Sequence, residues 1–293
     1  MTYHSSSAFR RALEDRLRSQ SLQTGEPLVR LRKMVAFDRC LARLVQVWPG
    51  AWMLKGGLAL QLRLGIGTRT TKDVDVELMA GREDAHRILV AATLFDLGDW
   101  FSFAVRPSAG QLPGPGEGGL RFHVTSRVDG RPFETFHIDV GIGDPVVEPV
   151  EYLTTPPLLA FADIPPSIVP CYPLSQHLAE KVHAYVRSRV SGESTRVKDL
   201  VDIVLLAERA TMGALALRRA LDATFATQGP GPAPSSLPAP PVVWAASFRK
   251  LAREVGLKYD TLDTAIAIAR RFVDPVLSGS ADGRWSSVSQ SWQ

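Results

Sequence analysis

The segment Lys55-Gly-Gly-Leu-Ala-Leu60, followed by Asp73-Val-Asp-Val-Glu-Leu78, decides the fold that this chain is expected to adopt. The apolar residues 51–54 just before it predict a buried strand, and the paired glycines permit a tight turn into a short helix. Polar and apolar residues then alternate strictly from 73 to 78, which is the pattern of a strand with one buried face. Two strands with a helix between them predict a sheet packed against helices.

Outward from this segment, the first part of the chain mixes helices with strands and the last part is helical throughout. Asp129-Gly130 is a strong signal for a two-residue hairpin turn between two of the strands. The predicted strands beyond 51–54 and 73–78 are 100–105, 120–128 and 132–142. The predicted helices are 7–23, 27–48, 82–97, 174–190, 195–210, 212–227, 243–255 and 261–273.

This order of elements predicts a mixed α+β fold with two lobes. The first lobe has a mixed β-sheet flanked by helices, and the second contains only helices. A proline-rich stretch around 143–172 marks the boundary. We therefore expect an N-terminal helical cap at 1–50, a sheet lobe at 51–155, a helical lobe at 156–277 and a flexible tail at 278–293.

Composition excludes several classes of protein. With 293 residues and 45% hydrophobic content, the chain can bury a sizeable core. Cys40 and Cys171 are its two cysteines, and their wide separation favours neither a disulfide framework nor a zinc site. The sequence has no window near the roughly 20 apolar residues that span a bilayer. A cytoplasmic protein is expected, and its net charge of +4 is compatible with phosphate-rich partners.

Asp73 and Asp75 are the first candidates for chemistry. They lie two residues apart on a predicted strand, so both carboxylates point to one face, roughly 6 to 7 Å apart. Such a pair repels itself unless a cation sits between the two groups, and an oxygen-only site suits Mg²⁺ or Mn²⁺. The alternative is an exposed strand face that carries two solvated acids.

A third carboxylate would complete a two-ion site. Asp139 lies in the alternating segment Phe136-His-Ile-Asp-Val140, on a strand that can neighbour the first, and Asp144 is its competitor. His137 shares the face of Asp139, but a histidine in a strand is more often packed or solvated, so we assign it no chemistry.

Residues before the acids are rich in hydrogen-bond donors and positive charge. Gly56 and Gly57 open a helix, where backbone N–H groups and the helix dipole favour a phosphate. Arg69, Thr71 and Lys72 follow immediately before the acids. They form either a contact surface for a triphosphate or an ordinary solvated loop.

In the predicted helical lobe, Lys181 lies away from the apolar stripe of its helix. The next helix brings Asp199 and Asp202 together at i, i+3, with Lys198 in reach of Asp202 at i+4. On local grounds these residues are surface ion pairs. Their position after a sheet lobe with a candidate metal site makes them candidates for function.

The order of these motifs resembles a known family. Lys55-Gly-Gly-Leu-Ala-Leu60 is followed by Arg69-Thr-Thr-Lys-Asp-Val-Asp-Val76, then Glu180-Lys181, then Arg196-Val-Lys-Asp-Leu-Val-Asp202. This is similar to the AbiE-type nucleotidyltransferase toxins of the DNA polymerase β superfamily, which include the mycobacterial MenT group. Residues 51–210 carry the resemblance, and the gap between Gly57 and Asp73 is longer than is usual in the superfamily.

The resemblance implies a bacterial toxin that arrests growth and is neutralised by a cognate antitoxin. It implies transfer of a nucleotide from an NTP to RNA, with the 3′ end of tRNA as the expected acceptor and aminoacylation as the step that is blocked. Asp73 and Asp75 would bind metal, and Lys181 would contact the phosphates. Asp202, with Asp199 as its competitor, would be the essential acid of the helical lobe. The remaining nucleotide contacts would come from Gly56, Gly57, Arg69, Thr71, Lys72, Lys198 and Asp199.

Four points stay open at the level of the sequence. The acceptor could instead be a hydroxyl on a protein or a small molecule, and the module could bind nucleotide without catalysis. An RNA acceptor in a cleft between the lobes would be steered by Arg187, Arg189 and Arg196. Phosphorylation of Thr70 or Thr71 would place a phosphate beside Asp73, where it should repel substrate phosphates and inhibit.

Overall fold

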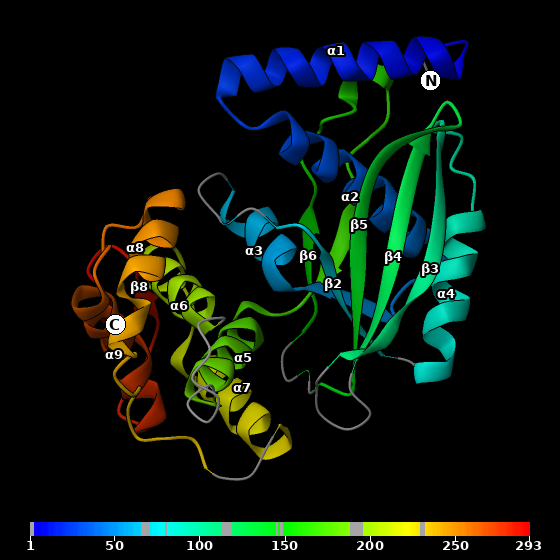
Figure 1. Ribbon diagram of the computed structural model, residues 1–293. Helices are drawn as coiled ribbons and strands as arrows, with labels where there is room; N and C mark the ends of the chain where they lie inside the picture. The colour runs from blue at the N-terminus through cyan, green and yellow to red at the C-terminus, as the bar shows by residue number, and fades with distance from the viewer. Residues whose placement is uncertain are drawn as a thin grey trace. The chain divides into compact units, whose positions relative to one another are not determined.

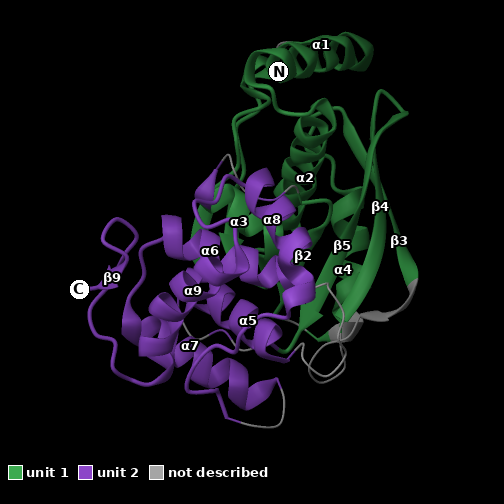
Figure 2. Ribbon diagram, turned by 60° about the vertical axis from the view of Figure 1, so that its left-hand side comes forward, with its two compact units in different colours: residues 1–63, 70–143, 151–171 green, residues 64–69, 144–150, 172–293 purple. Residues whose placement is uncertain are grey.

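A computed structural model describes residues 3–65, 69, 71–79, 81–112, 119–144, 146, 149–187, 196–228 and 232–293. The chain divides into two compact units (Figures 1 and 2). The first unit consists of residues 1–63, 70–143 and 151–171, and the second of residues 64–69, 144–150 and 172–293.

A seven-stranded mixed sheet forms the centre of the first unit, which confirms the predicted mixed α+β fold. The strand order is β3-β4-β5-β2-β1-β7-β6, in which β2 runs parallel to β5 and β1 parallel to β7. All other neighbours are antiparallel. The strands are β1 (Trp52–Lys55), β2 (Val74–Leu78), β3 (Phe101–Leu112), β4 (Gly119–Val128), β5 (Arg131–Ile142), β6 (Glu151–Thr154) and β7 (Ile168–Cys171).

The predicted hairpin between β4 and β5 is confirmed. Its two turn residues, Asp129 and Gly130, have φ of 55° and 66°. These left-handed conformations match the twist of the flanking strands and favour Asp-Gly. Beyond the turn the register shifts by one residue between Ser126 and Arg127, so the hairpin carries a β-bulge.

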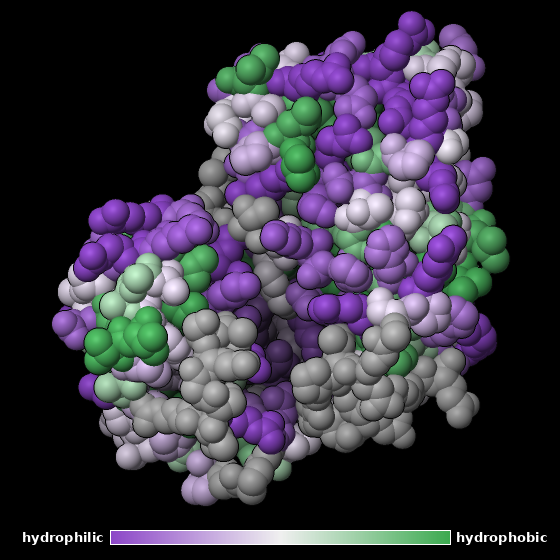
Figure 3. Space-filling view, viewed as in Figure 1, coloured by the Kyte–Doolittle hydropathy of each residue, from purple (hydrophilic) through white to green (hydrophobic). Residues whose placement is uncertain are grey.

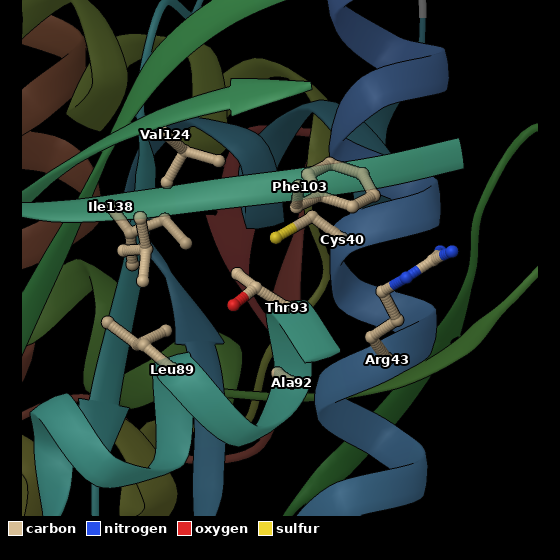
Figure 4. A pocket seen from close by; sticks show the side chains of 9 residues that line it. Cys40, Arg43, Leu89, Ala92, Thr93, Phe103, Val124 and Ile138 are labelled. Atoms are coloured by element: carbon tan, nitrogen blue, oxygen red, sulfur yellow. The ribbon is translucent and has the colours of Figure 1, made fainter. Parts of the chain in front are cut away.

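Two helices cover the apolar face of this sheet. The alternating residues Val74, Val76, Ile138 and Val140 are at most 3% exposed and join the core that α2 (Leu28–Val47) and α4 (Arg82–Leu94) complete. The side chains labelled in Figure 4 line a cavity in this layer, between α2, α4 and the strands β3, β4 and β5. The volume of this cavity is about 10 Å³. Such a volume holds at most one water molecule, so this layer is closely packed and is no substrate pocket.

The helix α1 (Ser6–Thr24) packs on the same core through Phe9, which is fully buried and stacks against Phe161. The hydroxyl of Ser5 caps its N-terminus by accepting from the Ala8 N–H, and Gly25 ends it with φ of 74°. The predicted N-terminal cap is therefore part of the first unit. The helix α3 (Gly56–Leu64) follows β1 directly, as predicted.

The strands β6 and β7 were not predicted, and they move the boundary between the units. The boundary predicted from the sequence lies at 155–156, but residues 151–171 belong to the first unit. The reason is that β7 pairs with β1 through Leu54 and Cys171, and both side chains are fully buried. Pro170 lies inside β7 and other prolines lie on both sides of it, and these prolines masked its strand signal.

The second unit is built from helices. These are α5 (Leu174–Arg187), α6 (Val197–Arg209), α7 (Ala214–Thr227), α8 (Ala245–Glu254) and α9 (Leu262–Leu277). The prediction of a flexible tail at 278–293 is wrong: β8 (Trp285–Ser286) and β9 (Ser291–Trp292) pair in this segment. Trp285 is fully buried against Phe272 and donates its indole N–H to the Ala207 carbonyl at 2.9 Å.

On the face seen in Figure 3, hydrophilic residues predominate and apolar areas are separate from one another. Among the described residues, no helix combines the length and the apolar character that a membrane crossing needs.

Candidate active site

Polar side chains form two rows on the face of the first unit's sheet that points away from α2 and α4. In the first row, which we call the charged row, Lys55 on β1 is opposite Asp75 on β2, Asp75 is opposite Asp139 on β5, and Asp139 is opposite Arg121 on β4. The second row consists of Asp73, His137 and His123. Strand alternation produces both rows, because the intervening residues are apolar and buried.

The glycine turn lies directly against Asp75. Gly56 has φ of 66°, and a Cβ at this position would overlap the Asp75 carboxylate and lie 2.7 Å from the Asp75 Cβ. A Cβ at Gly57 would lie 3.0 Å from the hydroxyl of Thr71, which donates to the Asp73 carbonyl at 3.2 Å. The structure therefore brings the predicted residues Gly56, Gly57, Thr71, Asp73 and Asp75 together.

Asp139 is close to the acids but already has a partner. Arg121 donates from Nε and from a terminal nitrogen to the two carboxylate oxygens of Asp139, at 2.7 and 2.6 Å. This hydrogen-bonded pairing is the main reason why the pKa of Arg121 lies above its ordinary value, and the charges of Asp73 and Asp75 add to it. The bidentate geometry is the strongest form of an arginine–carboxylate pair.

Two further contacts surround Asp73 and Asp75. His137 lies with Nδ1 3.2 Å from a carboxylate oxygen of Asp73. Lys55 pairs through Nζ with Glu77 at 2.7 Å, and Glu77 is 1% exposed. Lys55 and Glu77 thus form a buried ion pair beside Asp73 and Asp75. This pair lies against Gly141, at the point that a Cβ would occupy there.

Asp144, the alternative third acid, belongs to the second unit and accepts a hydrogen bond from the Gln228 amide at 2.8 Å. Lys72 is exposed, and Thr70 lies outside the described residues. Across the part of the chain that the structure describes, no three His, Cys, Asp or Glu side chains are grouped as a metal site. Asp73 and Asp75 stay the candidate metal ligands, as a pair.

The second unit contains a buried ionic cluster of Arg69, Lys181, Asp199 and Asp202. The Lys181 ammonium lies 3.1 Å from Asp199 and 3.2 Å from Asp202. Arg69 donates two hydrogen bonds to the carboxylate of Asp202, at 2.9 and 2.8 Å. Asp199 and Asp202 are 5% and 2% exposed, so their ion pairs are buried and do not lie at the surface.

Charge pairing sets the protonation states within this ionic cluster. Burial alone would lower the pKa of Lys181, but Asp199 and Asp202 outweigh it and raise that pKa. Burial alone would raise the pKa of Asp202, but Lys181 and Arg69 outweigh it and lower that pKa. Asp202 is therefore ionised at neutral pH, and the Lys181 ammonium is a fixed positive charge.

Other predicted residues of the second unit lie at its surface. Lys198 is exposed. The sequence placed it in reach of Asp202, but Asp202 pairs with Lys181 and Arg69 instead. Arg187 is exposed, and Arg196 reaches Asp199 at 3.5 Å. Arg189 lies outside the described residues.

Sequence reasoning missed Arg121, His123 and Glu77, and it assigned no role to His137. Alternation around Arg121-Phe-His123 was the available signal, because it places the arginine and the histidine on the face opposite to the buried phenylalanine. Which residues they face depends on the β-bulge, and the sequence does not reveal that bulge.

Comparisons with known proteins find a matching family model and similar solved structures. A family model described as the nucleotidyl transferase AbiEii toxin of type IV toxin–antitoxin systems matches residues 39–268. The solved structure of MenT4, a nucleotidyltransferase toxin from Mycobacterium tuberculosis H37Rv, aligns with a TM-score of 0.55 at 20% identity, over 91% of this chain and 98% of that one. A candidate nucleotidyltransferase from H. pylori aligns with a TM-score of 0.46 at 12% identity, over 84% and 96%.

The comparison with curated proteins finds no relative of this chain. The MenT4 likeness supports the fold, and the family model covers both the sheet with its acidic strand and the buried ionic cluster. The chain belongs to the AbiEii family of nucleotidyltransferase toxins of type IV toxin–antitoxin systems.

Proposed function

We propose that this toxin transfers a nucleoside monophosphate from an NTP to an RNA hydroxyl, with the 3′ end of tRNA as the acceptor, and thereby blocks aminoacylation and translation. One observation carries the proposal: Asp73 and Asp75 lie on one sheet face, and Gly56 brings the start of a helix against Asp75. A carboxylate pair beside a helix N-terminus suits a metal–triphosphate complex.

The residues present fit a divalent ion. Asp73 and Asp75 supply only oxygen ligands, which Mg²⁺ and Mn²⁺ prefer, and triphosphate oxygens and water would complete the coordination. When bound, the ion would neutralise charge on the triphosphate and lower the pKa of the acceptor hydroxyl. His137 orients Asp73 by its contact at 3.2 Å.

In the reaction, the acceptor oxygen forms a bond to the α-phosphorus of the NTP. The bond from this phosphorus to the bridging oxygen breaks, pyrophosphate leaves, and the hydroxyl proton passes to solvent. Negative charge develops on the pyrophosphate, and a fixed ammonium stabilises it. We assign this role to Lys181, with Asp199, Asp202 and Arg69 as the residues that hold it.

The sequence, the family and the exposure of four basic residues support the proposed partners, which are RNA, an antitoxin and an NTP. The net charge of +4 favours a polyanion, and Arg187 and Arg196 are exposed on the second unit. A cognate antitoxin follows from membership in a toxin–antitoxin family. Lys72 and Lys198 are exposed, as residues that contact a mobile substrate need to be.

The test is to incubate the protein with total RNA, Mg²⁺ and each labelled NTP in turn, beside an Asp75→Asn variant. The proposal predicts label in a tRNA-sized band that disappears in the variant. Label that follows protein, or a small hydroxyl compound, would assign the alternative acceptor. Tight NTP binding without pyrophosphate release would show a catalytically silent module and contradict the proposal.

A further inference from the structure

The charges around Asp73 and Asp75 are partly neutralised within the protein. Lys55 pairs with Glu77 at 2.7 Å, and Arg121 pairs with Asp139 at 2.6 Å. These two pairs cancel in charge. Asp73 and Asp75 place two further carboxylates beside them, and oxygen ligands of this kind suit a divalent cation.

Asp139 is poorly placed to bind that cation. Both of its oxygens accept from Arg121, so a metal ion could bind Asp139 only through the lone pairs that Arg121 leaves. The ion would then lie beside the guanidinium, and two cations at such a distance repel each other. Arginine cannot relieve the repulsion by losing its proton, because Asp139 holds its pKa even above the ordinary value.

Geometry also keeps Arg121 near the acids. It lies at the end of the charged row, one strand beyond Asp139, and Asp139 is directly opposite Asp75. The side chain of Arg121 is 38% exposed, while that of Asp139 is 17% exposed. The carboxylate of Asp139 thus fixes the guanidinium at the edge of the candidate metal site.

We propose that Asp139 anchors Arg121 and is no metal ligand, and that the Arg121 guanidinium takes the place of a second protein-bound cation. Asp139 is then a positioning residue, and the chain holds one divalent ion through Asp73 and Asp75. This inference rests on the proposed metal site at those two acids. It replaces the expectation from sequence that Asp139 completes a two-ion site.

The experiment counts Mn²⁺ ions bound per chain in the absence of nucleotide, by electron paramagnetic resonance of the free ion. The wild type should bind one ion. Arg121→Gln releases Asp139 and removes one positive charge, so it should bind Mn²⁺ about 10-fold more tightly or take up a second ion. The double variant Arg121→Gln/Asp139→Asn restores the charge and should bind one ion with an affinity within about 3-fold of the wild type.

Two results would overturn the inference. One is a loss of about 10-fold or more in Mn²⁺ affinity in the double variant, because Asp139 would then be a ligand. The other is Mn²⁺ binding by Arg121→Gln that equals that of the wild type, because the release of Asp139 should change it. Arg121→Lys keeps the charge without the bidentate contact and should still bind one ion; two ions in that variant would also contradict the proposal.

An Asp75→Asn control separates this inference from the function on which it rests. That variant should bind no Mn²⁺. If it binds Mn²⁺ like the wild type, the metal site itself is wrong. If only the Arg121 variants depart from expectation, the metal site stands and the role of Arg121 fails. Thermal unfolding followed by circular dichroism verifies that each variant is folded.

Discussion

Replacement of Gly56 by alanine should inactivate the enzyme without unfolding it. A Cβ there would lie 2.7 Å from the Asp75 Cβ, whereas ordinary contact begins at 3.4 Å, so one backbone must move by about 0.7 Å, the difference between the two distances. A displacement of about 1 Å at a reacting centre costs roughly 100-fold in rate. The positive φ of 66° adds about 1 to 2 kcal/mol of strain for any residue with a side chain.

Gly25→Ala is the matched control. Gly25 has a similar φ of 74°, but no atom lies within 4 Å of the point that a Cβ would occupy there. It should lose the same 1 to 2 kcal/mol, roughly, in urea unfolding and keep wild-type kcat/KM for nucleotide transfer. Gly56→Ala should lose about 100-fold in kcat/KM. A folded Gly56→Ala with wild-type activity would refute the inference that the glycine turn positions Asp75.

Three other predictions concern stability and reactivity. Lys55→Met removes one charge of the buried pair with Glu77, so urea unfolding should show a loss of about 3 to 5 kcal/mol; a loss below about 1 kcal/mol would contradict this. The lowered pKa of Asp202 means that its stabilising effect is complete above its unfolded pKa of 3.8 and is lost as the pH falls through the lower folded value. The difference in unfolding free energy between wild type and Asp202→Asn should therefore be constant near neutral pH and shrink below about pH 4; a difference that does not change with pH would contradict this. Burial raises the pKa of both cysteine thiols to about 12, so Ellman's reagent at about pH 8 should label neither in the native protein and both in urea; rapid labelling of the native protein would contradict their burial.

The sheet face that carries the acids could be predicted because local signals agree there. Strict alternation placed Asp73 and Asp75 on one face, and Asp129-Gly130 fixed the hairpin. The partner of Asp139 could not be predicted, because it depends on the β-bulge after Ser126. Without that one-residue shift, Asp139 would lie opposite a different residue of β4 and Arg121 would not face it.

In the second unit the sequence predicted the spacing of Asp199 and Asp202 but not their burial. Their main partners, Lys181 and Arg69, are distant along the chain, so the local pattern could indicate only surface pairs. The C-terminal segment was missed for a related reason: the burial of Trp285 depends on contacts with Phe272 and Ala207, and none of these is local.

The initial rate of pyrophosphate release from labelled NTP in the presence of RNA tests the central claim most directly. Asp75→Asn preserves the shape of the side chain and removes its charge, and it should lower this rate by about 1,000-fold or more. Asp15→Asn, at an acid whose side chain is 74% exposed, should leave it unchanged. An Asp75→Asn variant that keeps a rate within about 10-fold of the wild type would contradict metal-dependent nucleotide transfer at this strand.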